Sequence, residues 1–246
     1  MKSVAPVLRN LALGLAFAAV AYLGFQVVAR GTDPSTAHRL DTPLDHAIPF
    51  WSASVYLYSW SYTSILYPAF VIRSARLFRH VVAAYACVVG ISLVTFAVFP
   101  VTSLGFRPDV STLDLTRFDH WGVRLTFFVD PPTNLFPSLH MAAAVMAAAA
   151  AWVARPRYGV WALTFVVSIG GSILTMKQHY IADGVAACGL GILAWWLCLR
   201  PYQRRPEPLA ERAMGGGAVV AYLVFHASVY AALYLAFRLG YAPWAE

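Results

Sequence analysis

Two ionisable side chains in the second half of the chain are spaced for nucleophilic or acid–base chemistry. His179 and Asp183 lie four residues apart in the segment KQHYIAD (177–183). If this segment opens a helix, the two side chains share one face, and the carboxylate accepts a hydrogen bond from one imidazole nitrogen. The other nitrogen is then available as a nucleophile or base. A purely structural His–Asp bond at a helix end is the alternative, and the pair alone does not decide between the two.

A second histidine, His140, ends the segment NLFPSLH (134–140). Pro137 is typical of the first turn of a helix, and Ser138 is typical of its amino-terminal cap. The free N–H groups of such a turn, at Ser138 and Leu139, are suited to binding an anion. Taken alone, His140 is more simply explained as a histidine at the membrane interface.

Together the two segments supply the groups that phosphoryl transfer needs. His179 is the candidate nucleophile, and His140 is the candidate proton donor for the leaving oxygen. Lys177 and the helix start after residue 137 are the candidate phosphate-binding groups. Arg107 and Arg124, in the long connection 100–135, are weaker candidates for the same role, because loop arginines are usually solvated.

Membrane helices are the elements expected to position these residues. Of the 246 residues, 60% are hydrophobic and only 12% are charged, whereas soluble domains carry about 25% charged residues. Apolar runs of nearly the length needed to cross a bilayer cover the chain. The seven runs are 11–28, 50–72, 81–99, 136–154, 159–176, 180–199 and 217–237. We therefore expect an all-α, polytopic membrane helix bundle that forms one integral membrane domain over residues 1–246.

The distribution of charge predicts how the bundle is oriented. With a cytoplasmic amino terminus, the inner segments hold eleven basic residues and two acids, and the outer segments hold seven basic residues and nine acids. The positive-inside rule favours this orientation, which places both histidines on the extracytoplasmic side. Since the basic residues cluster between apolar runs, the net charge of +7 does not indicate nucleic-acid binding.

Other features of the chain carry less functional information. Run 11–28 is expected to be a retained helix, although a cleaved signal peptide is the alternative. The aromatic residues of connection 100–135 suggest a segment lying on the membrane surface. Cys87, Cys188 and Cys198 fall in apolar runs without a CxxC pair, so neither a disulfide nor a thiolate metal site is expected.

The motifs resemble those of a known family. FPSLH (136–140) and KQHYIAD (177–183) look like the second and third signature motifs of the type 2 phosphatidic acid phosphatase superfamily. This resemblance implies a six-helix core with both motifs at one membrane face. It also implies His179 as a nucleophile that forms a phosphohistidine, Asp183 as its orienting partner and His140 as general acid, with no metal or other cofactor. The catalytic core would span about 7–200, and a helix at about 214–238 would be an addition.

The chain also departs from the family pattern. The first motif is a lysine followed after six residues by Arg-Pro; Arg107-Pro108 is present here, but position 100 is proline. The Ser-Arg that often opens the third motif is Ser172-Ile173, so Lys177 is the candidate to replace the lost charge. Together with the segment DHAIPF (45–50), these departures resemble the branch that contains inositol phosphorylceramide synthases, enzymes of sphingolipid metabolism.

The expected function is therefore that of a membrane enzyme acting on a lipid-linked phosphate. It would transfer a phosphoryl or head-group phosphoryl group through a histidine intermediate to water or to an alcohol such as inositol or a lipid alcohol. In a bacterium the membrane would be the inner or plasma membrane. One alternative is a metal-dependent hydrolase with His140, His179 and Asp183 as ligands. Another is a transporter or scaffold, although transport sites usually lie at the midplane and these residues lie at one rim.

Overall fold

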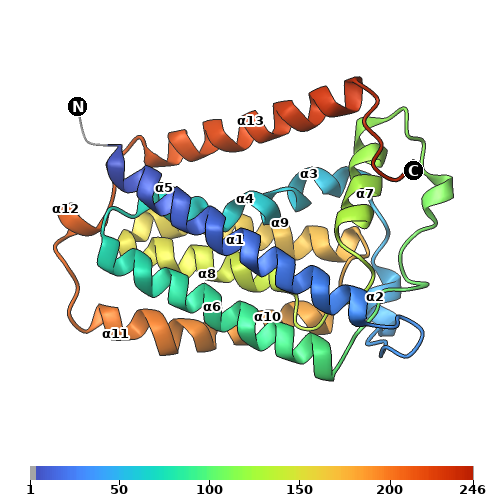
Figure 1. Cartoon of the computed structure of the whole chain (residues 1–246), viewed down its shortest axis with the longest axis horizontal. Helices are drawn as coiled ribbons and strands as arrows, with labels where there is room; N and C mark the ends of the chain where they lie inside the picture. The colour runs from blue at the N-terminus through green and yellow to red at the C-terminus, as the bar shows by residue number, and fades with distance from the viewer. Residues whose placement is uncertain (1–3, 246) are drawn as a thin grey trace.

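The computed structural model describes residues 4–245, and these residues form helices without any β-strand. Five helical segments are long and apolar enough to cross a membrane, which makes the chain a multi-pass membrane protein. They are α1 (Ala5–Gly31), α6 (Ala75–Val98), α9 (Pro156–Thr175), Ile181–Gln203 and α13 (Ala218–Arg238). Segment Ile181–Gln203 comprises α10 (Ile181–Ala194), the π-helical turn Trp195–Leu199 and α11 (Arg200–Gln203). All run along the long axis of one bundle (Figure 1).

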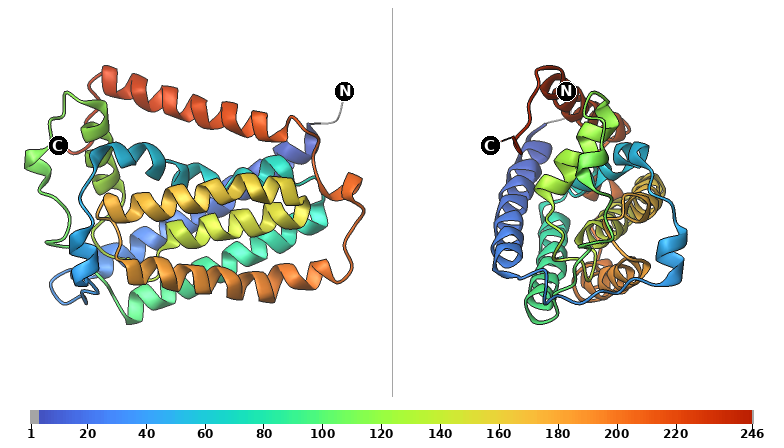
Figure 2. Two further views of the ribbon diagram at one scale, coloured as in Figure 1. Left: turned by 180° about the vertical axis from the view of Figure 1, so that it is seen from behind. Right: turned by 90° about the vertical axis from the view of Figure 1, so that its right-hand side faces the viewer.

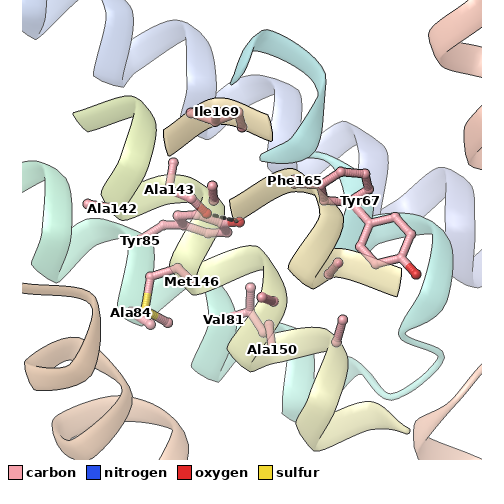
Figure 3. Packing of buried hydrophobic residues seen from close by; sticks show 14 of the residues in the cluster. Tyr67, Val81, Ala84, Tyr85, Ala142, Ala143, Met146, Ala150, Phe165 and Ile169 are labelled. Carbon is pink, nitrogen blue, oxygen red and sulfur yellow. Dashed lines mark hydrogen bonds between the residues drawn. The ribbon is translucent and has the colours of Figure 1, made fainter. Parts of the chain in front are cut away.

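The shorter helix α8 (Leu139–Ala154) forms the centre of the bundle. Most of its residues are buried, and α6, α9 and α10 pack around it. Its alanines leave room for larger side chains from the neighbouring helices, such as Tyr85, Phe165 and Ile169 (Figure 3). A Cβ atom on Gly191 would lie 2.5 Å from a Val145 side-chain carbon, so the glycine allows α10 to approach α8 closely.

The run 50–72 is not the single helix that its hydropathy predicts. It is a 3₁₀ turn (Ser52–Ser54) followed by three short helices, α3 (Val55–Tyr58), α4 (Trp60–Ser64) and α5 (Tyr67–Val71). Backbone bonds between residues three apart, such as Leu66 N–H to the Thr63 carbonyl at 2.9 Å, join the pieces. Pro68 lacks the N–H that would continue an α-helix there.

The other six predicted helices are present with shifted ends. Helices α1 and α6 begin six residues before their predicted starts, at Ala5 and Ala75 instead of 11 and 81. Arg9 and Arg79 lie between the observed and the predicted starts, and their charge lowers the local hydropathy from which a membrane helix is predicted. Helix α8 begins at Leu139, three residues after its predicted start, because Ser138 is its cap.

The long connection 100–135 contains a helix, α7 (Phe118–Val129). Helix α7 lies across one end of the bundle, close to the carboxyl-terminal end of α13 and beside α3 (Figures 1 and 2). The short α2 (Pro43–Ala47) and the 3₁₀ turn Val110–Thr112 lie at the same end. The short helices α11 and α12 (Leu209–Arg212), which carry basic residues, lie at the opposite end of the bundle.

This arrangement generates a topology prediction. Thr112 and Arg157 are both exposed, and they belong to opposite ends of the bundle. After the three native cysteines are replaced by alanine, we expect Thr112→Cys to react with an impermeant maleimide on intact cells and Arg157→Cys to react only after lysis. The reverse labelling pattern would show that the arginine-rich end faces outward.

Candidate active site

The two predicted histidine segments meet at one end of the bundle. The Ser138 N–H donates to the Asp183 carbonyl at 3.1 Å, which joins the start of α8 to the start of α10. The rings of His140 and His179 face each other edge to face, with centroids 5.9 Å apart. Residues that are 39 positions apart in the chain therefore border the same space.

His179 lies in the turn between α9 and α10, not on the face of a helix. Helix α10 begins at Ile181 with Tyr180 as its cap, so Asp183 occupies the third helical position. The predicted contact is nevertheless formed, because His179 Nδ1 lies 3.2 Å from Asp183 Oδ2. The same oxygen accepts the Tyr180 N–H at 2.9 Å. With a proton on Nδ1 shared with the carboxylate, Nε2 carries the lone pair.

Burial favours the neutral form of His179. Its side chain is 7% exposed. Burial lowers the pKa of the imidazole, and the neighbouring Asp183 carboxylate only partly opposes this effect. His179 is therefore unprotonated over a wider pH range than a solvated histidine, which is the state that a nucleophile requires.

The start of α8 differs slightly from the predicted capping pattern. Ser138 is the cap, and its Oγ accepts the Met141 N–H at 3.4 Å. Pro137 precedes the cap, after a cis peptide bond, and does not lie in the first turn. At the start of α8, the Ser138 N–H is bonded to the Asp183 carbonyl. The next two N–H groups, those of Leu139 and His140, have no hydrogen-bond partner within the described residues.

On its other side, His140 contacts a carboxylate that the sequence did not single out. His140 Nε2 lies 3.4 Å from Oδ2 of Asp130, the residue that follows α7. The same oxygen accepts hydrogen bonds from the Tyr58 hydroxyl at 3.0 Å and the Tyr62 hydroxyl at 2.5 Å. In the sequence, the only sign of this cluster is the four-residue spacing of Tyr58 and Tyr62. That spacing indicates a function only once the fold shows that the Asp130 carboxylate lies beside both hydroxyls.

Arg107 is the cation that the structure brings to the histidines. Its guanidinium donates to the backbone carbonyls of Asp130 at 2.8 Å and Pro131 at 3.2 Å, and also to the Gln178 side chain. Its Nε has no hydrogen-bond partner in residues 4–245. Burial lowers the pKa of the guanidinium to about 10, so Arg107 stays positively charged at neutral pH.

The predicted phosphate-binding roles of Lys177 and Arg124 are not supported by their positions. The Lys177 ammonium donates to the backbone carbonyls of Asp45 at 2.6 Å and Ile48 at 2.5 Å. It packs over the Phe106 ring, and its backbone φ of 57° lies in the left-handed region. Arg124 packs over Trp244, 5.4 Å from the ring centroid. Lys177 therefore ties the segment containing α2 to the turn before His179.

A small polar hollow lies between the histidines and the loops around them. Four of its lining residues each have a buried side-chain atom without a partner within the described residues, namely Arg107 Nε, Thr133 Oγ1, Asn134 Oδ1 and Gln178 Nε2. Buried polar groups are usually paired, so a cluster of unpaired ones indicates a site for a polar ligand. The polar residues lining the hollow are Tyr58, Arg107, Asp130, Thr133, Asn134, His140, Gln178 and His179.

An apolar groove adjoins this hollow. It passes between α1, α4 and α6, and His140, Leu139 and Asp130 belong to both the groove and the hollow. The remaining lining is almost entirely carbon, including Ala18 and Tyr22 of α1. A ligand with a polar head and an apolar chain matches this pairing of cavities.

Within residues 4–245, no group of three or more histidine, cysteine, aspartate or glutamate side chains is arranged to hold a metal ion. The two histidines each face a different carboxylate: Asp183 for His179 and Asp130 for His140. This pairing gives no support to the alternative in which His140, His179 and Asp183 jointly bind zinc.

Comparison with known proteins agrees with this helical site. The family model of the PAP2 superfamily matches residues 33–197, which are 165 of the chain's 246 residues. The chain belongs to the PAP2 superfamily, whose members are generally phosphatases. No curated protein and no solved structure matches the chain. Both α1 and α13 lie outside the matched residues.

The positions of Arg107 and Lys177 predict different mutant phenotypes. Arg107→Gln removes the cation at the hollow, and we expect turnover on a phosphate ester to fall on the order of 10²-fold. Lys177→Met removes two buried hydrogen bonds and should instead lower the unfolding free energy by about 2–3 kcal/mol. Arg124→Gln is the matched control and should change turnover little.

Steady-state kinetics and thermal unfolding of the purified variants separate these outcomes. A large loss of phosphate binding in Lys177→Met without a loss of stability would restore the role predicted from the sequence.

Proposed function

We propose that this protein is a membrane lipid phosphatase or phosphotransferase that works through a phosphohistidine at His179. The observation that carries the proposal is the opposition of His140 and His179 across a hollow, with Nδ1 of His179 held by Asp183. In this arrangement His179 Nε2 is the nucleophile, Asp183 orients it, and His140 is the general acid and base.

The reaction proceeds in two displacements. In the first, the lone pair of His179 Nε2 attacks phosphorus, a P–N bond forms, and the P–O bond to the lipid leaving group breaks. The departing oxygen takes a proton from His140. In the second, water or an alcohol gives a proton to His140 while its oxygen attacks phosphorus, and the P–N bond breaks. Both histidines return to their starting protonation states.

Groups around the hollow supply binding for the phosphate oxygens. Arg107 contributes positive charge, and the unpaired Nε2 of Gln178 contributes hydrogen bonds. The free N–H groups of Leu139 and His140 lie at the positive end of the α8 dipole. Ser138 supports the site as the helix cap, since its N–H and Oγ are already bonded.

A lipid substrate is supported by the apolar groove that meets the hollow at His140. The groove passes between helices that face the membrane, so an acyl or prenyl chain can lie in it while the phosphate reaches the histidines. The basic residues at the opposite end of the bundle support an extracytoplasmic location for the site.

The choice between water and an alcohol acceptor follows from the branch resemblance and not from the site geometry. The segment DHAIPF (45–50), which carries part of that resemblance, has a structural role here. Asp45 Oδ1 accepts the Ile181 N–H at 2.8 Å, and Lys177 bonds to two carbonyls of the same segment. Both acceptors, water and an inositol-like or lipid alcohol, stay within the proposal, and the branch resemblance is what favours the alcohol.

The roles of the histidines generate the central mutational prediction. His179→Ala should abolish a trapped phosphohistidine, because the nucleophile is absent. His140→Ala should slow turnover of a lipid phosphate by on the order of 10²–10⁴-fold. The same variant should lose less with an activated aryl phosphate, whose leaving group needs little protonation. Rapid-quench trapping and kinetics on both substrates measure these effects. Phosphohistidine that persists in His179→Ala would overturn the assignment.

Metal dependence distinguishes this proposal from metal-assisted hydrolysis. Covalent catalysis by His179 requires no divalent cation, so we expect turnover to persist in excess EDTA. Vanadate, which mimics pentacoordinate phosphorus, should inhibit because the site stabilises that geometry. Loss of turnover in EDTA that zinc restores would instead favour the metal hydrolase.

A further inference from the structure

We propose that Asp130 is the positioning residue of His140: it orients the imidazole and stabilises its protonated form as general acid. This inference rests on the proposed function, because it assigns Asp130 a role in the proton transfer that His140 performs. It would give the site two histidine–carboxylate pairs, one for the nucleophile and one for the acid.

Asp130 is built to present a carboxylate at a defined place. The residue follows the last turn of α7, and its N–H donates to the Thr126 carbonyl at 2.8 Å. Its side chain is 9% exposed. One oxygen, Oδ2, receives the hydroxyls of Tyr58 and Tyr62 and faces His140 Nε2 at 3.4 Å. The rings of both tyrosines also pack edge to face against His140.

The surroundings keep the carboxylate ionised. Burial alone would raise the pKa of the Asp130 carboxyl, but the nearby His140 and the two tyrosine hydroxyls outweigh burial and lower it. A buried carboxylate that lies within ion-pair distance of an imidazole stabilises the positive charge of that imidazole.

This contact determines which nitrogen of His140 can act on the substrate. Since Nε2 faces Asp130, Nδ1 is the nitrogen left to protonate the leaving oxygen, and it makes no hydrogen bond within the described residues. When Nδ1 gives up its proton, the proton on Nε2 stays beside the carboxylate. The incoming water or alcohol then returns a proton to Nδ1. His179 is held in the opposite sense, through Nδ1, and reacts through Nε2.

Helices outside the family-matched region hold Asp130 in place. Gln26 of α1 donates to the Val129 carbonyl at 3.1 Å, immediately before Asp130. The Trp121 indole N–H of α7 donates to the Tyr241 carbonyl at 2.8 Å, beyond the end of α13. Phe118 of α7 packs against Tyr234 of α13, with centroids 5.2 Å apart. The additional helix α13 therefore stabilises the element that carries the positioning carboxylate.

The pH profile of Asp130→Asn tests the proposal. The groups facing His140 are Asp130, Tyr58, Tyr62 and His179, and Arg107 binds the Asp130 carbonyl. Removal of the carboxylate charge makes the protonated general acid less stable, so the alkaline limb of the kcat/KM profile should move to lower pH. The acidic limb, which reports His179, should stay in place.

Other kinetic readouts separate positioning from a merely structural role. In Asp130→Asn, kcat on a lipid phosphate should fall with little change in KM, and the loss should be smaller on an aryl phosphate. Asp130→Glu keeps the charge and should recover most of the alkaline limb. Asp109→Asn changes an exposed carboxylate in the same loop and should match the parent protein. If Asp130→Asn does not accumulate, Asp130→Ser carries the same expectation.

Modification by diethyl pyrocarbonate provides a test that does not depend on turnover, because this reagent acylates the unprotonated imidazole. We expect the peptide containing His140 to become reactive at lower pH in Asp130→Asn than in the parent protein, as measured by mass spectrometry. An unchanged onset, with an unchanged alkaline limb, would overturn the role of Asp130. Absence of all phosphotransfer in the parent protein, with the shift in onset still present, would instead overturn the proposed function.

Discussion

The hydrogen bond from the Ser138 N–H to the Asp183 carbonyl joins the amino-terminal ends of α8 and α10, and the site depends on it. Each histidine lies within a few residues of this bond, so its geometry sets their separation. The bond requires the two helices to pack closely, and the alanines of α8 and the small Gly191 of α10 permit that approach. Bulkier residues along this contact would separate the histidines without changing either of them.

A cluster of ionisable groups at the end of an apolar bundle is stable only when its charges are paired. Asp183 is fully buried and receives His179 and the Tyr180 N–H, whereas Asp130 receives two hydroxyls and faces His140. Four of the residues that line the hollow, Arg107, Thr133, Asn134 and Gln178, each keep a side-chain atom without a partner within the described residues. The carboxylate oxygens next to the histidines, Oδ2 of Asp183 and Oδ2 of Asp130, are thus both paired, whereas some polar groups of the residues around the hollow are not.

The two basic residues near the site show how adjacency in the chain can mislead. Lys177 is two residues from His179, yet the left-handed turn at Lys177 directs its ammonium to carbonyls of the segment that contains α2. Arg107 is 72 positions from His179 and bonds to Gln178, which precedes that histidine. Closeness in the sequence therefore favoured Lys177 as the phosphate-binding cation, although Arg107 is the one that lines the hollow.

Local pattern was sufficient to predict the helical membrane architecture, the cap at Ser138 and the His179–Asp183 pair, because each depends on hydropathy or on residues within one turn of each other. The run 50–72 was predicted as one helix because hydropathy does not register irregular turns. The contacts of Asp130 with His140, Tyr58 and Tyr62 were beyond reach, since they join α3, α4, α7 and α8 across the bundle. Such contacts depend on how helices pack and where a loop folds back, and these are decided by the tertiary structure, not by the spacing of residues along the chain.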